Sequence, residues 1–302
     1  MTRLVVIGSV IADQLMTVPR LPARGGDVLA GPVATQAGGA FNIAAAAVRL
    51  GLPTALCGRI GTGPLGDLLI RALGDLGVDA LLPRGPSGDS GTCIGLVEPD
   101  GERTFVTSPG VEQQITDEDL ASIDWRPDDA VYLSGYDLVY PTTGPAAARW
   151  LARFRPRTLL VDPGPLIAEI PSDVLDAALA ATTVLSLNER ELGLLGEEPG
   201  GTLTTLWPRL ADGAVVVARV GADGAWLHRR DADPELIGSI PVDVVDTTGA
   251  GDAHAGALLA GLAEGLTLPA AIRRANAAAA LAVTRLGSAT GPTREELAAA
   301  LP

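Results

Sequence analysis

The chain is organised around residues 242–256, which read Val242-Asp243-Val244-Val245-Asp246-Thr247-Thr248-Gly249-Ala250-Gly251-Asp252-Ala253-His254-Ala255-Gly256. An apolar, β-branched run precedes a turn of threonines and glycines, and small residues at helical spacing follow as far as Gly265. This order predicts a strand at 242–246, then a tight loop, then a helix.

The predicted loop has the properties of an anion site. The first N–H groups of a helix have no intrahelical partner and lie at the positive end of the helix dipole. Gly249, Ala250 and Gly251 carry almost no side chain that would keep a phosphate from these donors. Asp252 follows in the first turn, either as a favourable helix-end charge or as a base beside a bound phosphate. The positive helix end favours its ionised form and so lowers its basicity.

Two well-known phosphate loops can be tested directly. A Walker A loop requires a lysine, and the chain contains none. A dinucleotide-binding fingerprint places its third glycine three residues after the second, where this chain has His254. The loop therefore belongs to neither class.

Composition narrows the class of protein further. The chain has 302 residues, of which 47% are hydrophobic, so we expect a globular fold. Its formal charge of −14, without an arginine stripe interleaved with aromatic residues, argues against nucleic acid as a partner. Cys57 and Cys93 have neither metal-ligand nor disulfide-framework spacing. No apolar run reaches the ~18 residues of a membrane span, so we expect no membrane association and a cytoplasmic location.

Short apolar runs alternate with helical patterns along the chain. Strands are predicted at 4–8, 54–60, 92–97, 103–107, 130–134, 158–162, 183–187, 214–220 and 225–228, and helices at 43–50, 68–76, 144–153 and 270–285. This alternation predicts an α/β domain spanning 1–302, with a mostly parallel sheet covered on both faces. Residues 13–38, together with a hairpin that turns at 98–102 within 91–109, predict a small β-sheet lid.

Polar residues follow several predicted strands, at the edge where open α/β sheets bind ligands. Asp13, which follows the first strand, is either a turn residue or a ligand contact. Gly38 and Gly39 precede an Ala-rich helix, with Asn42 in its first turn. Such a glycine pair is either an ordinary turn or a close approach to a ligand. The segment Asn188-Glu189-Arg190-Glu191 is either a helix start with solvated charges or a phosphate and metal site.

The stretch Asp246-Thr247-Thr248-Gly249-Ala250-Gly251-Asp252 resembles the C-terminal signature of the PfkB, or ribokinase-like, family of ATP-dependent carbohydrate and nucleoside kinases. With the Gly38-Gly39 and Asn188–Glu191 blocks, the resemblance extends from Gly8 to Pro292. It implies a ribokinase-like three-layer α/β/α fold, a mostly parallel central sheet and a small β-sheet lid. It also implies transfer of the γ-phosphoryl group of ATP to a hydroxyl of a small sugar.

The resemblance assigns roles residue by residue. Asp252 would be the base, and Gly249, Ala250 and Gly251 would hold the developing charge. The implied acceptor contacts are Asp13, Gly38, Gly39, Asn42 and Tyr136, and the implied ATP contacts are Asn188, Gly221, Gly224 and Asn276. Glu191 would bind Mg²⁺ through water, consistent with the preference of Mg²⁺ for few carboxylates. Asp246 and the carbonyl of Thr248 would be candidates for a K⁺ site.

The resemblance leaves more than one class of phosphoryl acceptor possible. Ribokinases carry Lys and Glu where this chain has Ala40 and Tyr136, so two polar sugar contacts are absent. Tyr136 could stack on a sugar or a nucleobase, which leaves a nucleoside kinase as the alternative. An inactive sugar-binding regulatory protein is the alternative outside enzymes. We expect the His254 side chain to pack inside the protein. The resemblance assigns no role to Arg219, because the family often carries Thr or Lys at this position. We expect the lids of two chains to pair in a homodimer.

Overall fold

The computed structural model describes residues 2–85, 87–99 and 101–301. Within these residues the main sheet has nine strands in the order β13-β12-β11-β10-β9-β8-β1-β4-β5. Neighbouring strands are parallel except at β11–β12 and β12–β13. The bounds are Leu4–Ile7 (β1), Thr54–Cys57 (β4), Asp79–Ala80 (β5), Ala130–Ser134 (β8), Thr158–Asp162 (β9), Val184–Asn188 (β10), Val215–Arg219 (β11), Ala225–Arg229 (β12) and Ala232–Ile237 (β13).

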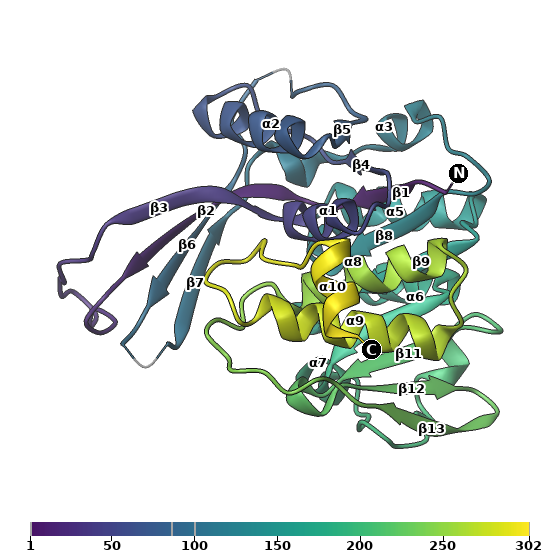
Figure 1. Ribbon diagram of the computed structural model, residues 1–302. Helices are drawn as coiled ribbons and strands as arrows, with labels where there is room; N and C mark the ends of the chain where they lie inside the picture. The colour runs from purple at the N-terminus through teal and green to yellow at the C-terminus, as the bar shows by residue number, and fades with distance from the viewer. Residues whose placement is uncertain (1, 86, 100, 302) are drawn as a thin grey trace.

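Alternating side chains along each strand fill two cores, one on each face of the main sheet. In β1, Leu4 and Val6 face one core, and Val5 and Ile7 face the other. The first core is covered by α1 (Ala40–Arg49), α2 (Pro64–Leu76), α8 (Ala250–Ala263), α9 (Leu268–Ala282) and α10 (Arg294–Ala300). The second is covered by α3 (Asp117–Ser122), α4 (Gly135–Val139), α5 (Thr143–Arg153), α6 (Ser172–Ala181) and α7 (Glu189–Leu194). This three-layer α/β/α arrangement confirms the predicted fold class (Figure 1).

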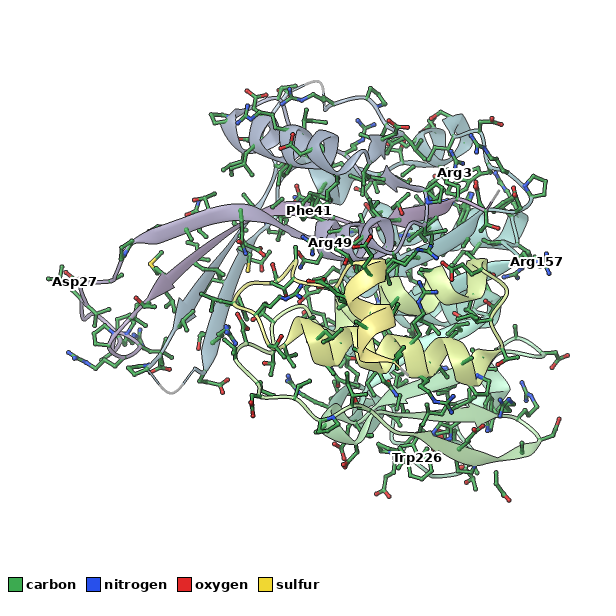
Figure 2. All side chains as sticks on the ribbon, viewed as in Figure 1. Arg3, Asp27, Phe41, Arg49, Arg157 and Trp226 are labelled. Atoms are coloured by element: carbon green, nitrogen blue, oxygen red, sulfur yellow. The ribbon has the colours of Figure 1, made fainter. Side chains whose placement is uncertain are left out.

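A second, smaller sheet projects from the main body (Figure 1). Its strands are β2 (Val10–Thr17), β3 (Val33–Gly39), β6 (Thr92–Val97) and β7 (Arg103–Ser108), in the order β3-β2-β6-β7. The outer pairs are antiparallel and the central pair is parallel. The β6–β7 hairpin has nearly the predicted bounds, although Asp100 in its turn lies outside the described residues. The β2–β3 connection carries Asp27 to the far end of this sheet (Figure 2).

Helix α8 lies between α1 and α9 and is made almost entirely of small and apolar residues. A Cβ atom on Gly256 would lie 2.7 Å from Cβ of Ala46 and 3.0 Å from the backbone N of Ala47. Only glycine therefore lets α8 approach α1 this closely. The close packing brings the first turn of α8, with Asp252, beside the first turn of α1, with Asn42.

The strand predicted at 242–246 is wrong. These residues are described, and they form an extended loop without a neighbour in either sheet. The N–H groups of Val245 and Asp246 both donate to the carbonyl of Val283, at the end of α9. Val244 and Val245 are 62% and 61% exposed, so their β-branched side chains do not enter a core. The helix predicted after the loop is confirmed as α8.

The order of the strands places a ligand crevice at β1. Strand β1 lies between β8 and β4, where the direction of chain progression along the sheet reverses. Ligands of open α/β sheets bind outside the carboxyl ends of the strands at such a point. Ser9 after β1 and Tyr136 after β8 line one cavity there. In the described part of the chain, no helix has the length and apolar character needed to cross a membrane.

Candidate active site

The loop before α8 adopts a conformation that only glycine tolerates. Gly249 is the N-cap residue with φ +76°, and a Cβ atom there would lie 1.9 Å from the carbonyl oxygen of Ser288. At Gly251 the situation differs, because a Cβ atom would meet no protein atom closer than 3.6 Å. Protein packing therefore does not require glycine at 251, and its missing side chain leaves space in front of the helix. Gly249, Ala250 and Gly251 all border this space.

Asp252 stands in the first turn of α8, where Asn42 holds it. The Asn42 side-chain amide donates to Oδ2 of Asp252 at 3.0 Å. Burial raises the pKa of Asp252 to about 7, and the charges of Asp162 and Asp13 add to this, while Asn42 and Arg219 oppose it. Desolvation thus outweighs the positive helix end, which we expected to favour the ionised form and lower basicity. At neutral pH the carboxyl group is poised to exchange a proton.

A cavity of about 370 Å³ opens above Asp252 and is bordered by both sheets. The small sheet contributes Asp13, Phe105 and Thr107, and the main body contributes Asn42 and Tyr136. The oxygen Oδ1 of Asn42 is buried and has no hydrogen-bond partner among the described residues. It is therefore an unpaired buried acceptor on a residue that borders the cavity.

Asp13 lies inside β2, in the small sheet, rather than at the carboxyl end of β1 as its place in the sequence suggested. A Cβ atom on Gly38 would lie 1.9 Å from Oδ2 of Asp13, so the bare glycine makes room for this carboxylate. Gly39, with φ +63°, turns the chain from β3 into α1 and borders the cavity itself. Burial raises the pKa of Asp13 to about 6.

Asp137 fixes the chain where it leaves β1. Its carboxylate accepts hydrogen bonds from the backbone N–H of Ser9 at 3.0 Å and from the Ser9 hydroxyl at 3.1 Å. Its side chain is fully buried, and burial raises its pKa to about 7. No local sequence pattern points to Asp137, because its partner Ser9 is 128 residues away in the chain.

A second cavity of about 690 Å³ lies on the other side of the α8 N-terminus. Gly221, Gly224, Asn188 and Asn276, predicted to contact ATP, all line it. The Asn276 amide is engaged within the protein, because it donates to the carbonyls of Ile237 (2.7 Å) and Gly238 (3.3 Å). The two cavities share a border of five residues, Asn188, Arg219, Thr247, Ala250 and Gly251.

His254 is buried, as expected, but it also lies on the wall of the second cavity. Its Nε2 lies 3.2 Å from Oδ1 of Asn276. Burial, followed by the charge of Arg219, lowers the pKa of His254 to about 3, so the ring is neutral. The acceptor oxygen of Asn276 requires the proton on Nε2.

Arg219 forms the centre of a charged cluster where the cavities meet. Its Nη1 donates to Oδ2 of Asp162 at 2.9 Å and to the hydroxyl of Ser186 at 2.6 Å. Its Nη2 lies 3.5 Å from Oε2 of Glu191. Asp162 is a site residue that was not predicted, although its place at the end of β9, on the edge where open α/β sheets bind ligands, was a usable signal.

Asn188 and Glu191 form a capping box at the start of α7, which confirms the helix start, but Glu191 is buried rather than solvated. Glu191 N donates to Asn188 Oδ1 at 2.9 Å, and Asn188 N donates to Glu191 Oε2 at 2.8 Å. Burial and then the charge of Asp162 raise the pKa of Glu191, which Arg219 opposes. Asn188 lines both cavities and Glu191 lines the first, so the residues of the cap also border the space where a ligand could bind. Among the described residues, no group of three or more His, Cys, Asp or Glu side chains could hold a metal ion.

Asp246 and Thr248 lie beside the anion loop, but Asp246 is already engaged. Its carboxylate accepts from the N–H groups of Thr248 (2.8 Å) and Gly287 (2.9 Å), and pairs with Arg103 of β7. Although burial acts to raise its pKa, these hydrogen bonds and the charge of Arg103 hold the pKa of Asp246 below its usual range. In this arrangement Asp246 does not fit as a free ligand for K⁺.

The sequence is similar to those of known kinases along nearly its whole length. Residues 1–295 match the pfkB family of carbohydrate kinases. The chain is 37% identical over 297 residues to the uncharacterized sugar kinase YegV of Escherichia coli K12, covering 97% of this chain and 92% of that one. It is 32% identical over 303 residues to the ATP-dependent ribose-1-phosphate kinase of Halopiger xanaduensis, covering 100% and 98%.

Solved structures show the same similarity in three dimensions. The ribokinase of Thermotoga maritima superposes with a TM-score of 0.84 at 25% sequence identity, covering 100% of this chain and 99% of that one. The ribokinase of Arabidopsis thaliana, solved with ribose and ATP, superposes with a TM-score of 0.79 at 27% identity, covering 99% and 98%.

Proposed function

Because the chain belongs to the pfkB family of carbohydrate kinases, it is an ATP-dependent phosphotransferase, and we propose that it phosphorylates an uncharged sugar bound in the first cavity. One observation carries this proposal. The two cavities meet at the N-terminus of α8, beside Asp252. ATP in the larger cavity would then present its γ-phosphoryl group to an acceptor in the smaller one.

The charges around the first cavity favour a neutral acceptor. Its walls carry the carboxyl groups of Asp13, Asp162, Glu191 and Asp252. Arg219 is the one cationic side chain from the described residues on these walls, and it is paired with Asp162. A sugar phosphate or sugar acid would meet uncompensated negative charge there. A polyol would instead find acceptors for its hydroxyl groups at Asp13 and at Oδ1 of Asn42.

In the proposed reaction, Asp252 accepts the proton of the attacking hydroxyl. A bond forms between that hydroxyl oxygen and the γ-phosphorus, and the bond from this phosphorus to the β–γ bridging oxygen breaks, so that ADP leaves. The N–H groups of Ala250 and Gly251 stabilise the charge that develops on the transferred group. The hydrogen bond from Asn42 keeps Asp252 directed at the acceptor.

We propose Glu191 and Asn188 as the residues that hold Mg²⁺ through water. They fit because both offer oxygen ligands on the wall of the first cavity, where Asn188 also borders the second, and Mg²⁺ keeps several waters and few carboxylates. When bound, the ion neutralises phosphate charge. K⁺ dependence stays a prediction, and the pairing of Arg103 with Asp246 opposes it.

A nucleoside acceptor is the second candidate, and one observation favours it. Tyr136 and Phe105 border the first cavity and are 41% and 49% exposed, so their rings are available to stack on a base. An inactive sugar-binding protein is less well supported, because such a protein has no use for a carboxyl group with a pKa near 7 beside the anion loop.

An ADP-coupled assay with pentoses, hexoses, keto sugars, nucleosides and sugar phosphates tests the acceptor class. We expect turnover with at least one uncharged sugar. A preference for a nucleoside would support the second candidate. A preference for a sugar phosphate, the class named for the Halopiger relative, would overturn the assignment of a neutral acceptor.

We further propose that the small sheet acts as a lid over the acceptor, since residues of β2 and β7 line the first cavity. A homodimer through this sheet is supported by exposed apolar side chains on it, including Val33 (53%) and Val106 (60%). The free thiols of Cys57 and Cys93 support a reducing, cytoplasmic location.

A further inference from the structure

Arg219 lies where the transferred phosphoryl group must pass. It is the last residue of β11 and borders both cavities, at the place where they meet in front of α8. Its guanidinium is the protein group nearest to a Cβ atom built on Gly251. The sequence left this residue without a role.

The two edges of the Arg219 guanidinium have different surroundings. Its Nη1 is anchored to Asp162 and Ser186 by hydrogen bonds of 2.9 and 2.6 Å. Its Nη2 has only the 3.5 Å contact with Glu191, which exceeds a normal hydrogen-bond length. Nη2 and Nε would lie 3.6 and 4.0 Å from a Cβ atom on Gly251. The edge with donors to spare is therefore the edge that faces the N-terminus of α8.

The anchors suit a group that must stay charged and stationary. Burial acts to lower the pKa of Arg219, but the carboxylates of Asp162 and Glu191 outweigh it and raise that pKa. A guanidinium held on one edge presents two parallel N–H groups on the other, the geometry that matches two oxygens of a phosphate. The same chain lacks lysine altogether, so no ammonium group can supply this charge.

We propose that Arg219 is a catalytic residue that donates from Nη2 and Nε to non-bridging oxygens of the γ-phosphoryl group during its transfer. Asp162 and Ser186 act as positioning residues for it. The inference rests on the proposed kinase function. It adds a side-chain cation to the backbone donors of Ala250 and Gly251 on the same transferred group. The alternative is a structural role, in which Arg219 only neutralises the largely buried carboxylate of Asp162.

The experiment compares Arg219→Gln, Asp162→Asn and the double variant, with Arg59→Gln as control. Arg59 forms a similarly buried pair with Asp119 (2.7 Å) but lines neither cavity. Each variant is assayed for kcat and for the KM values of ATP and acceptor. We expect Arg219→Gln to lower kcat roughly 10²–10³-fold, the usual effect of losing one transition-state donor, while Arg59→Gln stays near wild type.

The double variant separates the two roles. If Arg219 is catalytic, adding Asp162→Asn to Arg219→Gln should not restore kcat. A structural role predicts recovery to within about tenfold of wild type, because the unpaired carboxylate is gone. Such recovery, or a kcat for Arg219→Gln within about tenfold of wild type, overturns the proposal.

Nucleotide binding provides a readout that does not depend on the acceptor. Arg219→Gln should weaken binding of a non-hydrolysable ATP analogue by roughly tenfold or more, the loss of a charged hydrogen-bonded contact, and should change ADP affinity much less. Equal effects on both nucleotides contradict contact with the γ-phosphate. If wild-type protein turns over no acceptor, the proposed function fails, but this comparison still decides the role of Arg219.

Discussion

Among single residues, the proposed chemistry depends on Asp13 and Asp252, whose carboxyl groups the fold keeps partly out of water. Burial raises the pKa of Asp13 to about 6 and the pKa values of Asp137 and Asp252 to about 7. A raised pKa makes Asp252 a better proton acceptor near neutral pH, but it also means that the ionised form is unfavourable in the folded protein. Activity and stability therefore oppose each other at this residue.

The pH dependence of stability follows from Asp252. Its folded-state pKa, about 7, lies above the ordinary value of 3.8, so the free energy of unfolding falls as pH rises from about 4 to about 7. Asp252→Asn removes this loss. We expect its Tm to exceed that of wild type by a few degrees at pH 8, with the difference disappearing toward pH 4. Calorimetry across this range checks it, with exposed Asp243→Asn as control; equal Tm values at pH 8 contradict it.

We expect the same ionisation to set the pH dependence of catalysis, because Asp252 is the proposed base. Because the base must be deprotonated to accept a proton, kcat/KM for the acceptor should rise with pH, with a midpoint near 7, and level off above it. Initial rates at saturating ATP measure this profile. A rate that is independent of pH between 5.5 and 8 would show that the ionisation of Asp252 does not limit the reaction.

At the scale of helices and strands, periodicity predicted most elements, because each depends on its own local pattern. The run 242–246 failed because β-branched residues form a strand only beside a neighbouring edge, and none is present there. The anion loop lay within a recognisable motif. Asn42 and Asp252 were each predicted as site residues, but their hydrogen bond was not, because they are 210 residues apart in the chain. The cluster of Asp162, Glu191 and Arg219 could not be predicted. Asp162 ends β9, Glu191 follows β10 and Arg219 ends β11. These three strands are neighbours in the sheet, and a single sequence does not reveal the order of the strands.

Arg103 links strand β7 to the loop before α8, a contact that no local sequence pattern predicts. It begins β7 in the small sheet and pairs with Asp246, before the anion loop, with both side chains largely buried. Arg103→Gln should loosen the small sheet and raise the acceptor KM by roughly tenfold, with a smaller change in kcat. It should also make activity more sensitive to K⁺, because Asp246 loses its ion pair and keeps only the hydrogen bonds from Thr248 and Gly287. Assays with and without K⁺ check both effects.

The exposed pair of Arg149 and Asp117 supplies the control for this prediction, because it lies away from both cavities. Arg149→Gln should leave the acceptor KM unchanged. An Arg103→Gln enzyme with wild-type KM and no response to K⁺ would show that the ion pair does not couple the small sheet to the loop.

For the molecule as a whole, the projecting small sheet exposes apolar side chains on its edge strands. Its edge strands β3 and β7 carry exposed Val33 and Val106, away from the helices that cover the main sheet (Figure 1). We expect light scattering to give the mass of a dimer, and Val106→Asp to shift it toward the 30.7 kDa of one chain. Leu236→Asp, on edge strand β13 of the main sheet, is the matched control. A wild-type monomer would remove the proposed interface.

The most direct test of the central claim is single-turnover transfer from ATP to the preferred uncharged sugar by wild type and Asp252→Asn. We expect transfer by the wild type and a loss of roughly 10²–10⁴-fold in the variant, with affinity for a non-hydrolysable ATP analogue largely kept. Transfer by Asp252→Asn at the wild-type rate would contradict the role of Asp252 as the base.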